Sequence, residues 1–108
     1  MTSTIHISTA QRKILSALVD QYLPDVLVWA FGSRVKGNFR PDSDLDLVVF
    51  SKDTQSAAVS EFKEALDESS LPFSVDVLVW DEIGQDFQKH ILEKYAVFEH
   101  IERPPSTK

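Results

Sequence analysis

The sequence predicts an α/β (α+β) domain in which helices pack on a single β-sheet. Two observations carry this prediction: three short apolar runs have the length of strands, and the segments around them repeat apolar residues at helical spacing. The chain has 108 residues, the size of one domain. We therefore expect a single domain over residues 1–108, with an ordered core at about 8–100 and a frayed, proline-containing tail at 103–108.

The first helix is predicted over about residues 9–22. Ser8 and Gln11 have the spacing of a capping box, in which two side chains satisfy exposed amides at the helix start. Pro24 ends this helix, because proline cannot continue the backbone hydrogen bonding. The apolar residues of the helix form one stripe: Ile14, Leu15, Leu18, Val19 and Tyr22.

Three strands are predicted, at Val26–Phe31, Asp44–Phe50 and Phe73–Trp80. The first is a continuous apolar run, which is typical of a strand buried on both faces. Residues 34–43 have the Gly, Asn, Pro and Asp content of a turn-rich loop, with room for a helical turn near Ser33–Lys36.

Two more helices are predicted, at Thr54–Ser69 and Asp81–Lys94. The apolar residues at helical spacing in the first are Ala58, Phe62, Ala65 and Leu66. Those expected on one side of the second are Ile83, Phe87, Ile91 and Leu92. Tyr95–Ile101 is expected to form a last short strand or an irregular end.

The composition excludes several function classes. The chain has 17 acidic and 11 basic residues, a net charge of −6, so direct binding to a nucleic-acid backbone is not expected. The absence of cysteine excludes disulfides, thiolate metal sites and a cysteine nucleophile. No apolar run approaches ~18 residues, and the first six residues lack the layout of a signal peptide. We therefore expect no membrane span, and a cytoplasmic enzyme or binding module.

Three aspartates are the candidate metal ligands. Asp44 and Asp46 are separated by one residue on a predicted strand, so their side chains share one face with Cα atoms roughly 6.5–7 Å apart. Asp76 lies on the next predicted strand, between valines that face the other way. Acids buried together in an apolar sheet repel one another unless a cation joins them. Carboxylate oxygens suit Mg²⁺, and such a pair can bridge two ions about 3.5–4 Å apart.

A phosphate-binding turn is predicted beside these acids, at Gly32 and Ser33. Glycine lets the backbone approach a phosphate closely, and the following amides and the Ser33 hydroxyl can donate to phosphate oxygens. The nearest basic candidates for steering or clamping a triphosphate are Arg34, Lys36 and Arg40. Each feature alone has an ordinary interpretation as a capping pair, a turn or solvated loop charges. Their joint arrangement favours a metal and phosphate site.

The spacing of these residues resembles that of a known superfamily. Gly32-Ser33, ten further residues and an Asp-x-Asp resemble the signature of the DNA polymerase β-like nucleotidyltransferases, and in particular the minimal nucleotidyltransferases (MNT domain). The resemblance covers about residues 8–100 and implies a small mixed sheet with the acids on adjacent strands. It implies two Mg²⁺ ions bound by Asp44 and Asp46. Asp76 would be a third metal ligand or the general base.

The same resemblance implies a substrate and a partner. Gly32 and Ser33 would contact the triphosphate of ATP, and the family often places basic or polar residues at the positions of Arg34 and Lys36. MNT proteins are often encoded beside a HEPT-domain toxin. The implied reaction transfers AMP to a hydroxyl of that toxin, with tyrosine the expected acceptor, and neutralises it within a hetero-oligomer.

Two alternatives remain open. The chain could be an antitoxin that acts by direct binding without catalysis, or a small-molecule nucleotidyltransferase that needs a helical partner subunit. Aromatic residues are numerous for a small core, and most are expected to be buried: Trp29, Phe39, Trp80, Phe87, Tyr95 and Phe98. Phe39, in the polar loop, is the best candidate for exposure at an interface.

Overall fold

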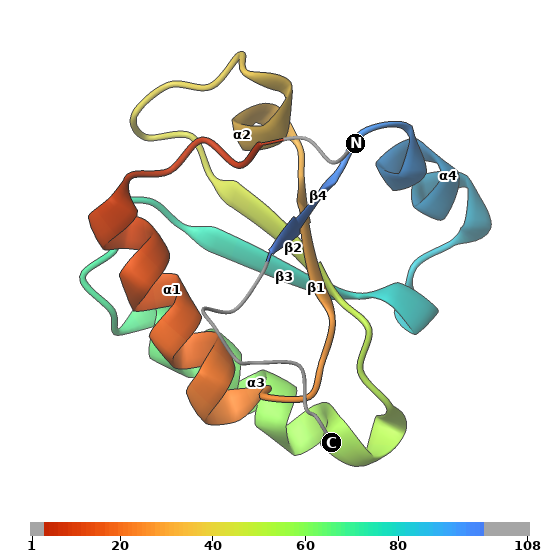
Figure 1. Cartoon of the computed structure of the whole chain (residues 1–108). Coiled ribbons are helices and arrows are strands. Elements are labelled where there is room, and N and C mark those ends of the chain that lie inside the picture. Colours follow the sequence, from red (N-terminus) through yellow and green to blue (C-terminus); the bar gives the residue numbers. More distant parts are fainter. Residues whose placement is uncertain (1–3, 99–108) are drawn as a thin grey trace, which may run out of the picture.

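One mixed sheet runs through the computed structural model, which describes residues 4–98 (Figure 1). Within those residues the sheet has four strands in the order β3-β2-β1-β4. Their bounds are β1 Val28–Phe31, β2 Leu45–Val49, β3 Val75–Val79 and β4 Ala96–Phe98. β1 is antiparallel to β2 and β4, whereas β2 and β3 are parallel. The predicted sheet is therefore confirmed, and its first three strands are shorter than predicted.

Two helices, α1 (Thr9–Tyr22) and α3 (Ser56–Asp67), cover one face of the sheet (Figure 1). A short 3-10 turn, η1 (Asp53–Gln55), leads into α3. The predicted capping box of α1 is present: the Gln11 amide donates to Oγ of Ser8 at 3.0 Å, and the Ser8 amide donates to Oε1 of Gln11 at 2.8 Å. The first helix begins and ends where the sequence predicts.

Strand alternation divides the apolar residues between two faces. Leu45, Leu47 and Val49 point to the core under α1 and α3. Val48 points to the opposite face, where it packs with Phe31 and other apolar residues. This division matches the alternation expected from the sequence. It places Asp46, which lies between Leu45 and Leu47, on the second face.

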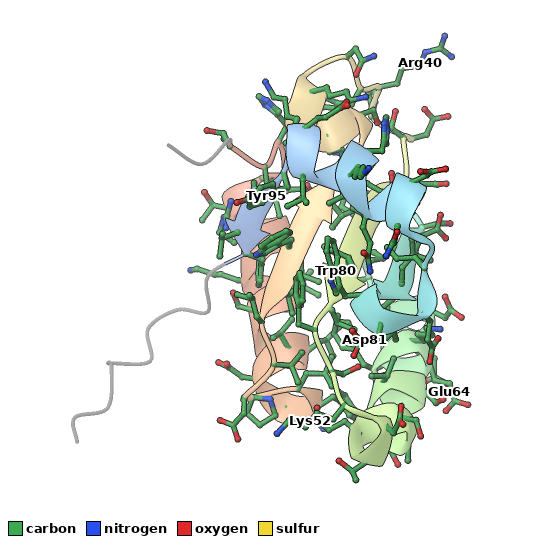
Figure 2. All side chains as sticks on the ribbon, turned by 90° about the vertical axis from the view of Figure 1, so that its right-hand side faces the viewer. Arg40, Lys52, Glu64, Trp80, Asp81 and Tyr95 are labelled. Atoms are coloured by element: carbon green, nitrogen blue, oxygen red, sulfur yellow. The ribbon has the colours of Figure 1, made fainter. Side chains whose placement is uncertain are left out.

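Helix α4 (Gln85–Glu93) lies on that second face, after a 3-10 turn η2 (Trp80–Glu82) (Figure 2). Of the apolar residues predicted to share one side of this helix, Ile91 is buried, whereas Phe87 and Leu92 are 38% and 50% exposed. A nine-residue helix is only about 13 Å long, so it covers part of the sheet and leaves its flanks uncovered.

Four half-buried aromatic rings pack together on this face beside α4, and Figure 2 labels two of them, Trp80 and Tyr95. Trp29 stacks on Tyr95 with ring centroids 3.9 Å apart, and its edge meets Trp80 at 5.8 Å. Phe50 completes the group, 4.6 Å from Trp29. Most aromatics therefore lie in or against the core, as expected. Phe39 is exposed to 37%, also as expected.

A short helix, α2 (Ser33–Lys36), follows β1 and ends at Gly37, whose φ of 97° requires glycine. The predicted final segment Tyr95–Ile101 contains β4, but its residues 99–101 lie outside the described residues, as does the predicted tail at 103–108. No helix in residues 4–98 combines the length and apolar content that crossing a bilayer requires.

Candidate active site

Two of the predicted acids lie side by side on the second face of the sheet. The register pairs Asp46 of β2 with Asp76 of β3 and, on its other side, with Phe31 of β1. Directly paired residues on neighbouring strands point to the same face. Both carboxylates line a cavity of about 460 Å³, together with Gly32 and the end of β1. The parallel pairing of β2 with β3 thus brings together the acids that the sequence placed on adjacent strands.

The environment of Asp46 disfavours its negative charge. Its side chain is half-buried, whereas Asp76 is exposed. Burial, followed by the neighbouring charges of Asp76 and Asp44, raises the pKa of Asp46 to about 6. A cation beside these carboxylates would offset both effects.

Asp44 stands apart from the other two acids. It precedes the first residue of β2, is exposed, and lines a neighbouring cavity of about 350 Å³ with Asp42 and Phe73. Within the described chain, no three His, Asp or Glu side chains lie close enough together to hold one metal ion. The predicted convergence therefore holds for two acids and not for the third. Strand alternation does not govern Asp44, because it lies before the strand begins.

The two acids that share the cavity fit Mg²⁺. This ion prefers oxygen ligands and is usually bound by one or two carboxylates together with waters and substrate phosphates. Asp46 and Asp76 supply that number of carboxylates, on adjacent strands and with mutual repulsion that a divalent ion would relieve. Asp44 is near enough for its charge to act on Asp46, although it lines a different cavity.

Position 32 requires glycine because of its backbone conformation and because of the nearby side chain of Asp46. Its φ is 84°, a region that residues with a Cβ rarely adopt. A Cβ built at this position would overlap Oδ2 of Asp46 and lie 3.2 Å from its Cγ. The missing side chain therefore makes room for the carboxylate, as well as permitting the turn into α2.

Replacing Gly32 with alanine is expected to weaken Mg²⁺ binding about tenfold and to lower the melting temperature by several degrees. The strained φ costs about 1–3 kcal/mol, and the new methyl group displaces the Asp46 carboxylate. Magnesium-dependent thermal shifts measure both effects. Gly37→Ala is the matched control, because it also has a positive φ but meets only the distant ring of His6 at 3.9 Å. Equal Mg²⁺ affinity in the two variants would contradict the proposed crowding of Asp46.

The other predicted phosphate contacts lie on α2. Ser33 is its first residue and is half-buried, and Lys36 is its last residue and is exposed. The amides of Val35 and Lys36 donate to the carbonyl of Gly32, both at 3.0 Å. The amide of Gly37 donates to the carbonyl of Ser33 at 2.9 Å, which closes the turn.

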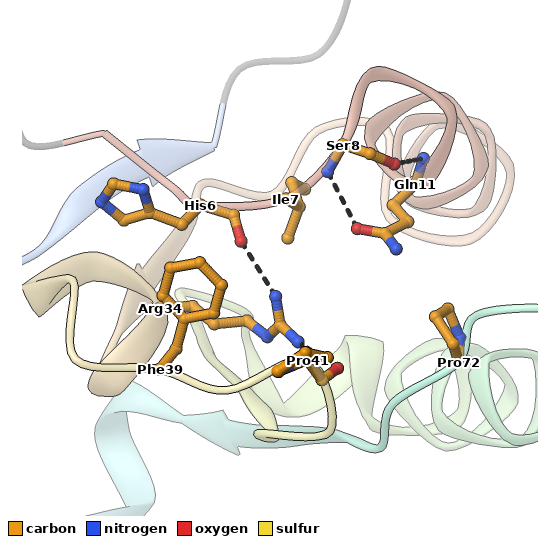
Figure 3. Close-up of a pocket in the computed structure, with 8 residues that line it drawn as sticks. All are labelled: His6, Ile7, Ser8, Gln11, Arg34, Phe39, Pro41 and Pro72. Atoms are coloured by element: carbon orange, nitrogen blue, oxygen red, sulfur yellow. Dashed lines mark hydrogen bonds between the residues drawn. The ribbon is translucent and has the colours of Figure 1, made fainter.

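Arg34 has a different environment from the one predicted. It is only 3% exposed, and its guanidinium lies 4.1 Å from the ring centroid of Phe73 and 5.1 Å from that of Phe39. Its nitrogens donate to four backbone carbonyls, and the bond to His6, at 2.9 Å, is drawn in Figure 3. The other three acceptors are the carbonyls of Ser43, Arg40 and Pro41, at 3.0, 3.3 and 2.9 Å.

Arg34 is therefore a clamp on the backbone. It ties the N-terminal segment to the loop that leads into β2, below a cavity of about 510 Å³ whose lining includes His6, Phe39 and Pro41 (Figure 3). Contact of the guanidinium with a phosphate would require these bonds to be exchanged, so we leave the Arg34 side chain out of the nucleotide site. Burial lowers the pKa of this guanidinium and the nearby Asp42 raises it. An arginine in such a site stays charged.

Two residues that line the acid cavity were missed by the sequence interpretation. Phe87 was one of six aromatic residues of which most were expected to be buried, and His90 was not considered. Both lie on α4, three residues apart, and so share one side of the helix. The signal that could have found them is this spacing, on a helix that packs over the same face as Asp46. The sequence alone did not show how far α4 extends beyond the sheet.

Comparisons with known proteins show the family to which the chain is similar. A family model described as the nucleotidyltransferase domain matches residues 11–98. The chain is 39% identical over 100 residues to the protein named probable protein adenylyltransferase MntA from Haemophilus influenzae, which covers 92% of this chain and 88% of that protein.

Two solved structures share the fold. A structure of a minimal nucleotidyltransferase candidate superposes with a TM-score of 0.62 at 26% identity, over 80% of this chain and 87% of the other. A crystal structure of a toxin–antitoxin with AMP-PNP gives a TM-score of 0.67 at 19% identity, over 84% of this chain and 74% of the other. At 19% identity the second similarity concerns the fold alone.

Proposed function

The chain belongs to the nucleotidyltransferase domain family, as its motif predicted, and from this premise we propose that it is a Mg²⁺-dependent antitoxin that transfers AMP from ATP to a protein partner. The observation that supports this most strongly is the pairing of Asp46 with Asp76 beside Gly32. Oxygen ligands on adjacent strands, next to a turn without a side chain, suit a metal ion and a triphosphate in one cavity.

Each residue has a distinct role in the proposed reaction. Asp46 and Asp76 hold Mg²⁺, and Asp44, just before β2, adds its negative charge to the attraction for the ions. When bound, the ions offset negative charge on the phosphates. An oxygen of Asp76 accepts the proton of the attacking hydroxyl, a role suited to the more exposed acid of the pair. The bond from that hydroxyl oxygen to the α-phosphorus forms as the bond to pyrophosphate breaks.

The turn after β1 binds the triphosphate in this proposal. The first amides of a helical turn have no acceptor within the helix, so those of Ser33 and Arg34 are available to phosphate oxygens. The φ of Gly32 turns the chain so that these amides lie beside the acids. Lys36 is exposed at the end of the same turn and contributes positive charge to the approach of the nucleotide.

The acceptor in our proposal is a tyrosine hydroxyl on a cognate HEPT-domain toxin in the cytoplasm. The relative from Haemophilus influenzae is named a probable protein adenylyltransferase, which supports a protein acceptor. One of the structural neighbours is a toxin–antitoxin with AMP-PNP, which supports a toxin as the partner and ATP as the donor. Modification of the acceptor would neutralise the toxin within a hetero-oligomer.

We expect the partner to be labelled when the purified chain is incubated with Mg²⁺, the cognate HEPT-domain toxin and ATP that is labelled in its α-phosphate. ATP labelled only in its γ-phosphate is expected to give no label, because AMP is transferred and pyrophosphate leaves. Mass spectrometry of the partner should then find AMP on a tyrosine. Absence of α-label, or undiminished label with the Asp44→Asn, Asp46→Asn double variant, would contradict the proposal.

The same double variant separates catalysis from simple binding. If the toxin is neutralised by modification, cells that express it lose protection when both acids are replaced. If protection persists while transfer is lost, the chain neutralises its partner by covering it.

A further inference from the structure

The acid cavity has an aromatic wall that the proposed reaction does not use. Phe87 of α4 lines the same cavity as the two carboxylates, and 38% of its surface is exposed. Single exposed rings are common on protein surfaces, but this one lies in the cavity that also holds the acids, where a ligand bound at the acids would meet it. His90 lines the same cavity from the next turn of α4.

Two neighbouring rings, those of His90 and Phe31, hold the ring of Phe87 in position. The rings of Phe87 and His90 are 16° from parallel, with centroids 6.0 Å apart. Phe31 of β1 meets Phe87 edge-on at 5.7 Å and is itself buried, so it holds the Phe87 ring in place. His90 also lies 3.9 Å from Glu93, but both side chains are largely exposed and such a pair contributes little.

The position of the aromatic wall relative to the acids indicates whether it meets the donor nucleotide or the protein acceptor. Phe31 precedes Gly32 directly, so the wall begins one residue from the turn proposed to bind phosphate. Asp76 lies on β3, an edge strand of the sheet, and is exposed. A protein acceptor can reach Asp76 from this open edge. The aromatic wall lies on the β1 side of Asp46, and Asp76 lies on the opposite side. The wall is therefore left for the donor nucleotide.

We propose that Phe87, which stacks with His90, is the platform on which the nucleobase of the donor triphosphate stacks. The proposal rests on the proposed function, because it needs the triphosphate at the acids. Stacking on an aromatic ring recognises the planar face that every base has, so the platform sets nucleotide affinity and not base identity. A cavity of about 460 Å³ lies in the size range of small-ligand sites.

Nucleotide binding without the partner tests the platform. Calorimetry would compare the Mg²⁺ complex of α,β-methylene-ATP, which cannot release pyrophosphate, with the Mg²⁺ complex of tripolyphosphate, which has no base. Phe87→Ala is expected to weaken binding of the nucleotide about tenfold and to leave tripolyphosphate binding unchanged. Phe87→Tyr, which keeps the ring, is expected to restore nucleotide affinity. Leu92→Ala is the matched control, an exposed apolar residue of the same helix that does not line the cavity.

The outcomes are distinguishable. Nucleotide affinity that is indifferent to Phe87 would overturn the platform alone, and so would an equal loss for nucleotide and tripolyphosphate. A Phe87→Ala variant that binds nucleotide normally but fails to label the partner would assign the ring to the acceptor instead. If the unaltered chain binds neither probe with Mg²⁺, the proposed function fails and the platform with it.

Discussion

Replacing Asp46 with asparagine is expected to lower AMP transfer at least about a thousandfold. Asp46 lies between Phe31 and Asp76 in the strand register, and its carboxylate occupies the space that a side chain at position 32 would need. Loss of its charge removes a metal ligand, and a thousandfold loss corresponds to about 4 kcal/mol of transition-state stabilisation. Initial rates of α-label transfer to the partner measure the effect.

The same substitution is expected to stabilise the metal-free protein. Folding raises the pKa of Asp46 to about 6, above the value of 3.8 for an exposed aspartate, so the folded state holds this proton more tightly. The ionised carboxylate therefore destabilises the fold, increasingly as the pH rises from about 4 to 6, and fully at neutral pH. Removing it should raise the melting temperature without Mg²⁺ by about 4–8 °C for each 1 kcal/mol regained.

Asp81→Asn provides the control, because Asp81 is an exposed acid after β3 that lines a different cavity. It should keep both the transfer rate and the response to Mg²⁺. An Asp46→Asn variant that transfers AMP at the normal rate would remove Asp46 from the proposed mechanism. A variant that is inactive and also less stable than the unaltered chain would point to a structural role instead.

Replacing Arg34 with methionine is expected to destabilise the fold by about 3 kcal/mol and to lower the melting temperature by more than about 10 °C. Four backbone carbonyls lose a charged donor in this variant, and the loop before β2 loses its connection to the N-terminal segment. Arg34→Lys should recover little, because one ammonium group cannot reproduce the planar guanidinium fork. Thermal unfolding measures both variants.

Arg40→Met is the matched control, since Arg40 belongs to the same loop and its side chain is exposed. We expect no change in its melting temperature beyond about 2 °C, in line with an exposed substitution. The sequence predicted a phosphate contact for Arg34, and the two roles give different results. A variant with normal stability but weaker tripolyphosphate binding would restore Arg34 to the nucleotide site.

Much of the sheet and two of its acids could be predicted from the sequence. Alternation along two strands was enough to place Asp46 and Asp76 opposite the valines and leucines of the core, because one face of each strand is buried against α1 and α3. The capping box of α1 is equally local, since it depends on two residues three positions apart. Such features depend on a few neighbouring residues and are visible in a single sequence.

Features that depend on distant segments were missed. The burial of Arg34 results from carbonyls supplied by His6 and by the loop up to Ser43, which only the folded chain brings together. A basic residue in a polar loop gives no sign of that environment. The orientation of Asp44 was predicted from strand alternation, but β2 begins one residue after Asp44. The exposure of Phe87 depends on how far α4 reaches beyond the sheet, which periodicity does not specify.

The parallel pairing of β2 with β3 has a consequence for the order of folding. Parallel neighbours cannot be joined by a tight turn, and here residues 50–74, with α3, form the crossover. Asp46 and Asp76 meet only after this crossover has docked, and their approach is opposed by their own charge. No local fragment of the chain contains the pair. The appearance of metal affinity during refolding should therefore report a late event, the closure of the β2–β3 ladder, and divalent cations should favour that closure.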